Sequence, residues 1–334
     1  MTRIGIIGAG NWGTALAVIA ARAGHEILLW SRNTEVVHNI NTQRVNSVYL
    51  SNTLVPETVV ATSDLKIAVG AQQLLIIAVP AQSVRQLLID SGDGLSDYSI
   101  VISAAKGIEF STGMRISEVV RAIIGEQIDK RFVCLSGPSF AREVVDGHPT
   151  AIVAASVNLK TAQSVQKELS FENLRIYTNT DVTGTELGGS VKNVIAIAAG
   201  MAAGLGFGSN SIAALITRGL AEMRRLAVQQ GARTETLMGL AGLGDLVLTC
   251  TGKLSRNRYV GYELGLGKTL AHIKSTMTEV AEGIETCAAV KRLADCNSLE
   301  MPITEQVHAV LYQAKPAQVA VEELMTRPLR QEGY

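Results

Sequence analysis

A glycine-rich turn between two apolar runs lies at the start of the chain. The run Arg3–Ile7 leads directly into Gly8-Ala9-Gly10-Asn11-Trp12-Gly13, a helical pattern that ends at Gly24, and a second run, Glu26–Trp30. A strand, a GxGxxG turn, a helix and a strand in this order form the βαβ unit that binds dinucleotides. The turn brings a pyrophosphate close to the backbone, and the helix N-terminus offers it N–H groups. The sequence therefore predicts a dinucleotide at Gly8, Gly10 and Gly13; the alternative is a turn that holds no ligand.

Apolar runs alternate with helical patterns through the rest of the first half. This order predicts an α/β fold with a Rossmann-type, doubly wound parallel sheet. Near-continuous apolar runs are typical of strands that are covered on both faces. Further strands are expected at Leu74–Val79, Ser99–Ser103, Arg131–Leu135, Thr150–Ala154 and Leu174–Thr178, and helices at Ala81–Asp90, Gly113–Ile124 and Thr161–Leu169.

The pattern changes after about Asp181, where strand-like runs nearly vanish. Helices are expected over Glu186–Gly204, Ile212–Gln230, Met277–Asp295 and Thr304–Leu311. A chain of 334 residues also exceeds the usual size of a single core. We therefore predict a dinucleotide-binding domain over residues 1–181 and an all-α substrate-binding domain over residues 182–334. No motif is assigned to the tail, Ala314–Tyr334.

Charge and composition exclude several classes of protein. The 30 basic residues balance the 30 acidic ones, which argues against a nucleic-acid or anionic-membrane partner. The spacings of the 4 cysteines and 5 histidines predict neither a metal site nor a disulfide framework. Residues 193–217 carry no charge, but Ala- and Gly-rich sequence and a polar interruption favour a helix buried in protein. We expect a soluble cytoplasmic protein without stable membrane insertion.

The end of the second predicted strand bears on the choice of cofactor. NAD sites usually carry a carboxylate there, which binds the ribose 2′-hydroxyl. This chain has Ser31-Arg32-Asn33 instead, so a guanidinium is available for a 2′-phosphate. The sequence favours NADP(H), with NAD(H) possible. In the alternative, Arg32 is solvated and Glu35 binds the ribose.

Two lysines are candidates for acid–base or electrostatic roles. Lys192 lies at the head of the uncharged helix, with Gly188 and Gly189 on its neighbouring turn. Small residues allow another segment to come close, and the resulting burial would lower the pKa of the lysine toward the range useful for proton transfer. In the alternative, the ammonium group of Lys192 reaches water. Lys106 follows a predicted strand at the sheet edge where ligands bind in open α/β folds.

Two further segments could contact ligands. The turn Ser136-Gly137-Pro138-Ser139-Phe140-Ala141 follows another predicted strand, although turn formation alone also explains its composition. Ser255 is a candidate helix N-cap, which places Arg256 and Asn257 in the first turn. An arginine there is unfavourable unless an anion lies nearby, so a phosphate site is expected. The alternative is a solvated basic loop.

With these residues assembled, the chain resembles the bacterial-type NAD(P)-dependent glycerol-3-phosphate dehydrogenases over nearly its whole length. Several ordered motifs at matching separations are more specific than any one of them. They are Gly8–Ala15, Lys106-Gly107, Ser136–Ala141, Lys192–Ile197, Gly204–Gly208, Ala241–Leu246, Ser255–Arg258, Val280–Gly283 and Met301–Ile303.

The resemblance implies reversible reduction of dihydroxyacetone phosphate to sn-glycerol 3-phosphate, which supplies phospholipid synthesis, by a homodimer. It implies that Lys192 donates and accepts the proton. On chemical grounds, we expect Lys106 to give electrostatic support to the developing alkoxide and Asp245 to orient Lys192 or a substrate hydroxyl. The implied cofactor contacts are Asn11, Trp12, Arg32, Ala141, Val280 and Glu282. The implied substrate contacts are Gly137, Ser139, Lys192, Asp245, Ser255 and Asn257, with Lys106 and Arg256 touching both ligands.

Two other functions compete with this interpretation. A two-domain dehydrogenase of small hydroxy acids would also use a lysine, but it needs a carboxylate clamp in place of the phosphate site. A redox sensor that binds NADP(H) without catalysis would keep the glycines. It would have no reason to combine Lys106, Lys192 and Asp245, so the combination favours catalysis.

Overall fold

The computed structural model describes the chain except for residues 71, 95–98, 278–279, 330 and 332–334. It divides into two compact units, residues 1–105 with 116–182, and residues 106–115 with 183–334. The segment 106–115 therefore belongs with the helical unit, whereas the sequence placed it in the first domain. Ile108 explains the difference, because it is fully buried in the hydrophobic core of the helical unit.

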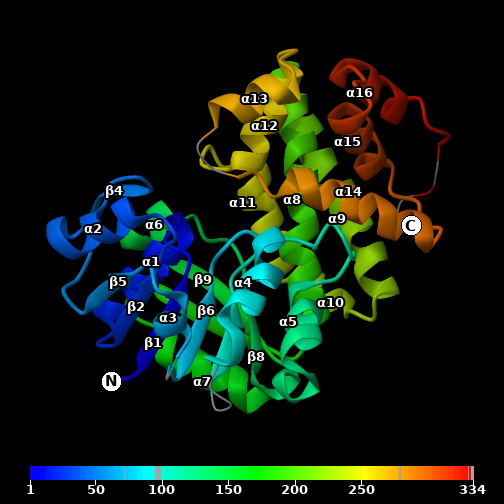
Figure 1. The fold of residues 1–334 in the computed structure, drawn as a ribbon. Helices are drawn as coiled ribbons and strands as arrows, with labels where there is room; N and C mark the ends of the chain where they lie inside the picture. Colours follow the sequence, from blue (N-terminus) through cyan, green and yellow to red (C-terminus); the bar gives the residue numbers. More distant parts are fainter. Residues whose placement is uncertain (71, 95–98, 278–279, 330, 332–334) are drawn as a thin grey trace. The chain divides into compact units, whose positions relative to one another are not determined.

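The first unit is built on an eight-stranded sheet with the order β10-β9-β8-β7-β6-β1-β2-β5 (Figure 1). All seven predicted strands are present, with ends shifted by at most two residues. The short strand β5 and a separate antiparallel ribbon, β3–β4, were not predicted. The strands are β1 (Arg3–Ile7), β2 (Glu26–Trp30), β3 (Val45–Asn46), β4 (Leu50–Leu54), β5 (Val59–Thr62), β6 (Leu74–Ile77), β7 (Ile100–Ser103), β8 (Phe132–Ser136), β9 (Thr150–Ala155) and β10 (Leu174–Asn179).

The predicted Rossmann-type, doubly wound sheet is confirmed, but the sheet is not wholly parallel. β8 and β9 pair antiparallel, with Leu135 opposite Ala154, while β9 and β10 are parallel to each other. Residues 137–149 join β8 to β9 with only one short helix, α6 (Ala141–Val145). An antiparallel pair needs no long crossover, so this connection is sufficient.

Helices cover both faces of the sheet. α1 packs with α6 and α7, whereas α4 contacts α3 and α5 (Figure 1). The predicted helix at Ala81–Asp90 begins as a 3-10 turn, Ala81–Ser83, before α4. The other helices are α1 (Asn11–Arg22), α2 (Thr34–Gln43), α3 (Leu65–Val69), α4 (Val84–Ser91), α5 (Ile116–Ile124) and α7 (Leu159–Leu169).

The strand order places the glycine-rich turn at a topological switch point. From β1 the chain moves outward to β2 and β5, then returns to the opposite side of β1 to form β6. Ligands of open α/β sheets bind outside the carboxyl ends of strands at such a point. The turn that begins at Gly8 lies at the end of β1, beside the end of β6.

The second unit is helical, as predicted, and its core surrounds α8 (Val182–Gly204). By length and composition α8 could cross a membrane, but 89% of its most apolar window is buried inside the protein. The predicted helix at Met277–Asp295 begins only at Gly283, and residues 278–279 lie outside the described part. The remaining helices are α9 (Ser209–Gln229), α10 (Thr234–Met238), a π-helical turn (Leu240–Gly244), α11 (Asp245–Thr251), α12 (Arg256–Gly265), α13 (Leu270–Thr276), α14 (Gly283–Cys296), α15 (Pro302–Tyr312) and α16 (Ala317–Met325), which lies in the unassigned tail.

Glycines allow α8 and α12 to pack backbone against backbone. A Cβ atom at Gly261 of α12 would lie 2.0 Å from the Ile197 carbonyl oxygen of α8. A Cβ atom at Gly200 of α8 would in turn lie 2.1 Å from the Arg258 carbonyl oxygen. The close approach fixes the N-terminal end of α12 against the helix that carries Lys192.

We predict that Gly261→Ala destabilises the second unit, because the added methyl group has no room beside a rigid backbone carbonyl. Overpacking of this kind costs about 1–3 kcal/mol or more. Urea denaturation of the variant and the parent chain would measure the loss. Gly208→Ala is the matched control, since a Cβ atom there would meet no described atom within 4 Å; because Gly208 is the N-cap of α9, where Ala is less favourable than Gly, it should cost about 1 kcal/mol or less. Equal stability of Gly261→Ala and the parent would refute this account of the packing.

Candidate active site

The glycine-rich turn of the first unit forms a cradle with close backbone packing. Gly8 has a φ of +116°, and a Cβ atom there would lie 2.6 Å from the Ala78 carbonyl oxygen. A Cβ atom at Gly13 would lie 1.8 Å from the Gly8 carbonyl oxygen, so neither position accepts a side chain. A Cβ atom at Gly10 would meet no described atom within 4 Å. The turn is therefore closed on the sheet side and open at Gly10, which fits a pyrophosphate.

The start of α1 is suited to an anion. Gly10 is the N-cap and provides no side-chain hydrogen bond, and the first turn contains no acidic residue. The positive end of the helix dipole is therefore not neutralised by the helix itself. Asn11 and Trp12, both predicted cofactor contacts, lie in this first turn.

Arg32 lies beyond the carboxyl end of β2 and is exposed. The preceding residue, Ser31, is buried and its hydroxyl accepts a hydrogen bond from the Asn33 N–H. Asn33 caps α2 by accepting a hydrogen bond from the N–H of Glu35, which is also exposed. Arg32 and Glu35, the two side chains predicted to discriminate between the cofactors, are therefore both accessible, and their ligand contacts stay predictions.

The turn after β8 has a structural role of its own. Gly137 has a φ of +134°, and a Cβ atom there would lie 2.9 Å from the Cα of Ile152. The hydroxyl of Ser139 donates a hydrogen bond of 3.1 Å to the Gly137 carbonyl. Turn formation alone thus accounts for Gly137, and the ligand contacts of Gly137, Ser139 and Ala141 stay predictions.

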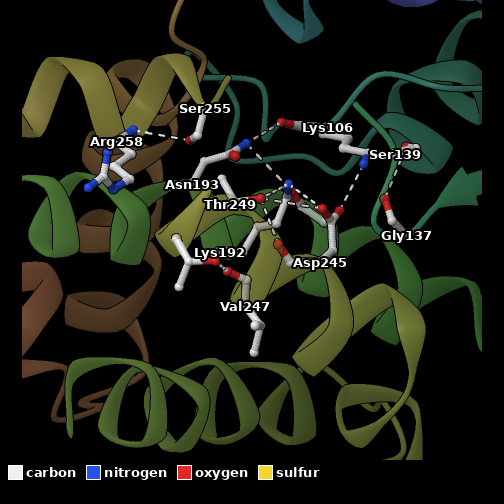
Figure 2. A network of polar contacts seen from close by, with 12 residues as sticks. Lys106, Gly137, Ser139, Lys192, Asn193, Asp245, Val247, Thr249, Ser255 and Arg258 are labelled. Carbon is white, nitrogen blue, oxygen red and sulfur yellow. Dashed lines mark hydrogen bonds and ion pairs between the residues drawn. The ribbon is translucent and has the colours of Figure 1, made fainter. Parts of the chain in front are cut away.

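In the second unit, two lysines share one buried carboxylate (Figure 2). The Nζ atom of Lys192 lies 2.7 Å from Oδ1 of Asp245, and Nζ of Lys106 lies 2.8 Å from Oδ2. Lys192 also donates to the hydroxyl of Thr249 at 2.6 Å. An ammonium group has three donors, so one donor of Lys192 has no acceptor within the described residues. The three predicted catalytic residues therefore form one cluster.

Two helices and one loop supply this cluster. Lys192 belongs to α8, and Asp245 begins α11. Gly188, one turn before Lys192, lets the π-helical turn ahead of Asp245 approach, since a Cβ atom there would lie 2.5 Å from the Ala241 carbonyl oxygen. The sequence predicted such an approach beside Lys192, and the approaching segment is Leu240–Gly244.

The loop that carries Lys106 is fastened to the helical unit at several points. The side-chain amide of Asn193 donates to the Lys106 carbonyl oxygen at 3.2 Å. At the other end of the loop, Arg115 forms an ion pair of 3.0 Å with Glu186. Together with the buried Ile108, these contacts fix the backbone from which Lys106 reaches Asp245.

Burial and charge determine the proton affinities of the cluster. Burial lowers the pKa of Lys192 to about 8; the Asp245 carboxylate opposes the shift, and the Lys106 ammonium adds to it. Burial alone would raise the pKa of Asp245, but Lys106 and Lys192 more than offset this effect and lower it. Asp245 therefore remains ionised, while Lys192 can gain or lose a proton near neutral pH.

The N-terminus of α12 has the predicted geometry. Ser255 is the N-cap, and its hydroxyl accepts a hydrogen bond of 3.2 Å from the Arg258 N–H. Arg256 is exposed in the first turn. Asn257 is buried, and its Oδ1 atom accepts a hydrogen bond of 2.9 Å from the Gly283 N–H.

Gly283 begins α14, directly after Val280-Ala281-Glu282, where two cofactor contacts were predicted. Val280 is exposed and Glu282 is half-buried. Asn257 thus ties this segment to the N-terminus of α12.

Comparison with known proteins gives the family. Residues 3–162 match the family model of the NAD-dependent glycerol-3-phosphate dehydrogenase N-terminus, and residues 181–322 match that of its C-terminus. The chain belongs to the NAD-dependent glycerol-3-phosphate dehydrogenase family. The resemblance predicted from the sequence is confirmed.

Individual relatives agree over the full length of the chain. A glycerol-3-phosphate dehydrogenase (NAD(P)+) of Koribacter versatilis is 49% identical over 330 residues, which are 98% of each chain. Another from Geobacter sp. (strain M21) is 48% identical over 331 residues, 99% of each chain. The crystal structure of glycerol-3-phosphate dehydrogenase from Coxiella burnetii matches with a TM-score of 0.93 and 40% identity, covering 98% of this chain and 99% of that one.

Two polar residues of the dehydrogenase cluster were missed in the sequence. Thr249 lies one helical turn after Asp245, and its hydroxyl donates to the Asp245 carbonyl oxygen at 2.6 Å. Asn193 directly follows Lys192. The spacing of four residues from Asp245 was a usable signal for Thr249. No local signal indicated that Asn193 would bind the backbone of Lys106, because the two are 87 positions apart.

We predict that removing the charge of Asp245 and removing the charge of Lys106 shift the pKa of Lys192 in opposite directions. Asp245→Asn removes a carboxylate that favours the protonated form, so the pKa should fall below about 8. Lys106→Met removes a like charge, so the pKa should rise. An NMR pH titration of Nζ in lysine-labelled protein, assigned with Lys192→Arg, would measure both shifts.

Lys291 provides an internal control in the same spectra, because it pairs with Asp295 on the surface of α14. Its titration should be unchanged in both variants. Shifts of the same sign in Asp245→Asn and Lys106→Met would contradict the electrostatic account of the cluster.

Proposed function

We propose that the chain catalyses the NAD(P)-dependent interconversion of dihydroxyacetone phosphate and sn-glycerol 3-phosphate. Membership of the dehydrogenase family supports the reaction. The observation that carries the proposal is the buried Lys192, whose pKa of about 8 allows proton transfer in either direction near neutral pH.

The reaction needs a proton at the carbonyl oxygen. The nicotinamide, when bound, supplies the hydride for the carbonyl carbon. Lys192 donates its proton to the oxygen as negative charge develops there, and in the reverse direction it accepts the proton from the hydroxyl. Lys106 adds a positive charge that stabilises the developing alkoxide. Asp245 holds both ammonium groups in place.

We assign the substrate phosphate to the N-terminus of α12. The first turn offers backbone N–H groups and the exposed guanidinium of Arg256, and both suit a phosphate. The Oδ1 atom of Asn257 accepts a hydrogen bond from the Gly283 N–H, which fixes the orientation of the amide. The amide nitrogen of Asn257 is then the group that can donate to an anion. Binding the phosphate here would position the carbonyl for reaction.

The cofactor proposal rests on Arg32, which favours NADP(H) over NAD(H) because its guanidinium suits a 2′-phosphate. On the family resemblance we also propose a cytoplasmic homodimer that supplies glycerol phosphate for phospholipids. The remaining assigned contacts, including Val280, Glu282 and Ser139, carry over from the same resemblance.

The hydroxy-acid dehydrogenase and the redox sensor are the alternatives. The first would need a fixed cation for a carboxylate beside the reacting carbon, and it gives no reason for the α12 terminus. The second gives no reason to bury Lys192 and Asp245 together, with Lys106 partly buried beside them, because burying charges is costly unless they are used.

The decisive experiment is initial-rate oxidation of NADPH with dihydroxyacetone phosphate, beside unphosphorylated dihydroxyacetone. We expect turnover with the phosphorylated ketone and at least 100-fold lower kcat/KM without the phosphate, since a charged anchor is lost (on the order of 3 kcal/mol). Turnover of a hydroxy or keto acid instead would favour the first alternative. Binding of NADPH without any turnover would favour the sensor.

Lys192→Ala serves as the control for mechanism in the same assay. It should lower kcat at least 100-fold, because the group assigned to proton transfer is lost, while the Kd for NADPH stays within about twofold. Thermal denaturation would verify that the variant folds. Near-normal turnover would remove Lys192 from the proposed role.

A second prediction concerns the cofactor. Arg32→Asp should raise the KM for NADPH by more than tenfold, because a carboxylate replaces the guanidinium near the 2′-phosphate, while NADH is affected far less. Initial rates with both cofactors at saturating ketone would measure the change. Equal effects on NADPH and NADH would contradict the assignment of Arg32, and Arg22→Asp on α1 would control for a general charge effect.

A further inference from the structure

The side chain of Asn46 reaches the glycine-rich turn from an element outside the main sheet. Asn46 lies in the ribbon strand β3 and is fully buried. Its Nδ2 atom donates one hydrogen bond of 2.8 Å to the Ala9 carbonyl oxygen and a second of 2.8 Å to the hydroxyl of Thr14. Both hydrogens of the amide therefore serve the turn and the first helical residues that follow it.

Thr14 completes a small network on the same carbonyl. Its hydroxyl accepts the bond from Asn46 and donates a bond of 3.3 Å to the Ala9 carbonyl oxygen. Its backbone N–H bonds to the Gly10 carbonyl oxygen at 2.9 Å. Two side-chain donors thus converge on one peptide of the turn, and both donors belong to buried side chains.

This network sets the direction of the Gly10 N–H. In a planar trans peptide, the carbonyl oxygen and the N–H point in opposite directions. With the Ala9 carbonyl held toward Asn46 and Thr14, the N–H of Gly10 is turned to the opposite side. Gly10 is the residue of the turn at which a Cβ atom would meet no described atom within 4 Å.

The ribbon is itself constrained so that Asn46 points inward. The pairing of β3 with β4 shifts register between Val45 and Asn46, and such irregularities redirect side chains. Arg44 has a φ of +56°, a left-handed conformation that is unfavourable for arginine. Its guanidinium holds the strained residue by donating to the carbonyl oxygens of Val55 and Val59 at 3.1 and 2.9 Å.

The site requires an amide rather than a carboxylate. The Ala9 carbonyl can only accept, so the group that faces it must donate, and an aspartate would supply no donor. The Oδ1 atom of Asn46 is buried and has no hydrogen-bond partner within the described residues. Burying an amide oxygen without a hydrogen-bond partner opposes folding. The two hydrogen bonds donated by Nδ2 of Asn46 therefore account for the orientation of this side chain.

We propose that Asn46 is a positioning residue for the cofactor pyrophosphate: it fixes the Ala9–Gly10 peptide so that the Gly10 N–H faces the phosphate oxygens. The proposal rests on dinucleotide binding by the first unit, and it is independent of the substrate and of Lys192. It predicts that replacing Asn46 weakens the binding of every ligand that carries a pyrophosphate. The preference between NADPH and NADH, which depends on the 2′ position, should stay unchanged.

The test is the Kd of Asn46→Ala for NADPH, NADH and ADP, measured by titration calorimetry without substrate. We expect all three Kd values to rise about tenfold, with the NADPH to NADH ratio unchanged, because a preorganised phosphate donor is lost. The kcat at saturating NADPH and the KM for dihydroxyacetone phosphate should stay within about twofold. This split between binding and turnover distinguishes positioning from a general loss of structure.

Asn41→Ala is the matched control. Asn41 ties α2 to β5 through two bonds with the Ala61 backbone, of 2.9 and 2.8 Å, and does not touch the turn. It should lower the thermal midpoint and leave the three Kd values unchanged. Equal changes of Kd in Asn41→Ala and Asn46→Ala would overturn the proposal, as would a lower midpoint of Asn46→Ala with unchanged Kd values.

Variants of Thr14 test the same proposal if Asn46→Ala does not fold. Thr14→Val removes the hydroxyl at nearly constant volume and should weaken all three ligands, whereas Thr14→Ser should restore binding. Equal binding by Thr14→Val and the parent would overturn the proposal. A parent chain that binds NADPH but turns over no substrate would refute the proposed reaction and leave the role of Asn46 to be decided by these Kd values.

Discussion

The ion cluster of Asp245 with Lys106 and Lys192 is the constraint on which the helical unit depends. A carboxylate that is 1% exposed is tolerated only when opposite charges and hydrogen bonds surround it. The two ammonium groups meet this need, and Asp245 in turn holds two lysines that would otherwise repel each other. Thr249 and Asn193 complete the arrangement, the first by accepting a hydrogen bond from Lys192 and the second by holding the backbone of Lys106.

Close backbone packing brings these groups together, and glycine makes it possible in both units. Gly188 allows the segment before Asp245 to pack closely against α8, and Gly261 allows α12 to pack closely against α8. In the first unit, Gly8 and Gly13 bring the turn against the end of β6 and the start of α1. These four glycines lie within a few residues of groups that we assign to ligand binding, so they serve the proposed function as well as folding.

The two units use different chemical groups for the roles that we assign to them. For the cofactor pyrophosphate, we propose that the first unit uses main-chain N–H groups at a helix N-terminus, which depend on a fixed backbone. Asn46 and Thr14 serve that backbone. For proton transfer, we propose that the second unit uses charged side chains, whose proton affinities depend on burial and on each other. Substitutions in the first unit should therefore change affinity, whereas those in the second should also change dependence on pH.

The sequence by itself determined the local features: the strand, turn and helix around Gly8–Gly13, the cap at Ser255, and a helical second half. Each depends on residues close together in the chain, where spacing and propensity act directly. Only the tertiary structure decided that Lys106 belongs to the helical unit, that β9 runs antiparallel to β8, and that Asn46 holds the Ala9 carbonyl. These depend on contacts between residues far apart in sequence, such as Lys106 and Asp245, which are separated by 139 positions. Such contacts form because burying apolar surface brings distant segments together, and no local pattern encodes which partners meet.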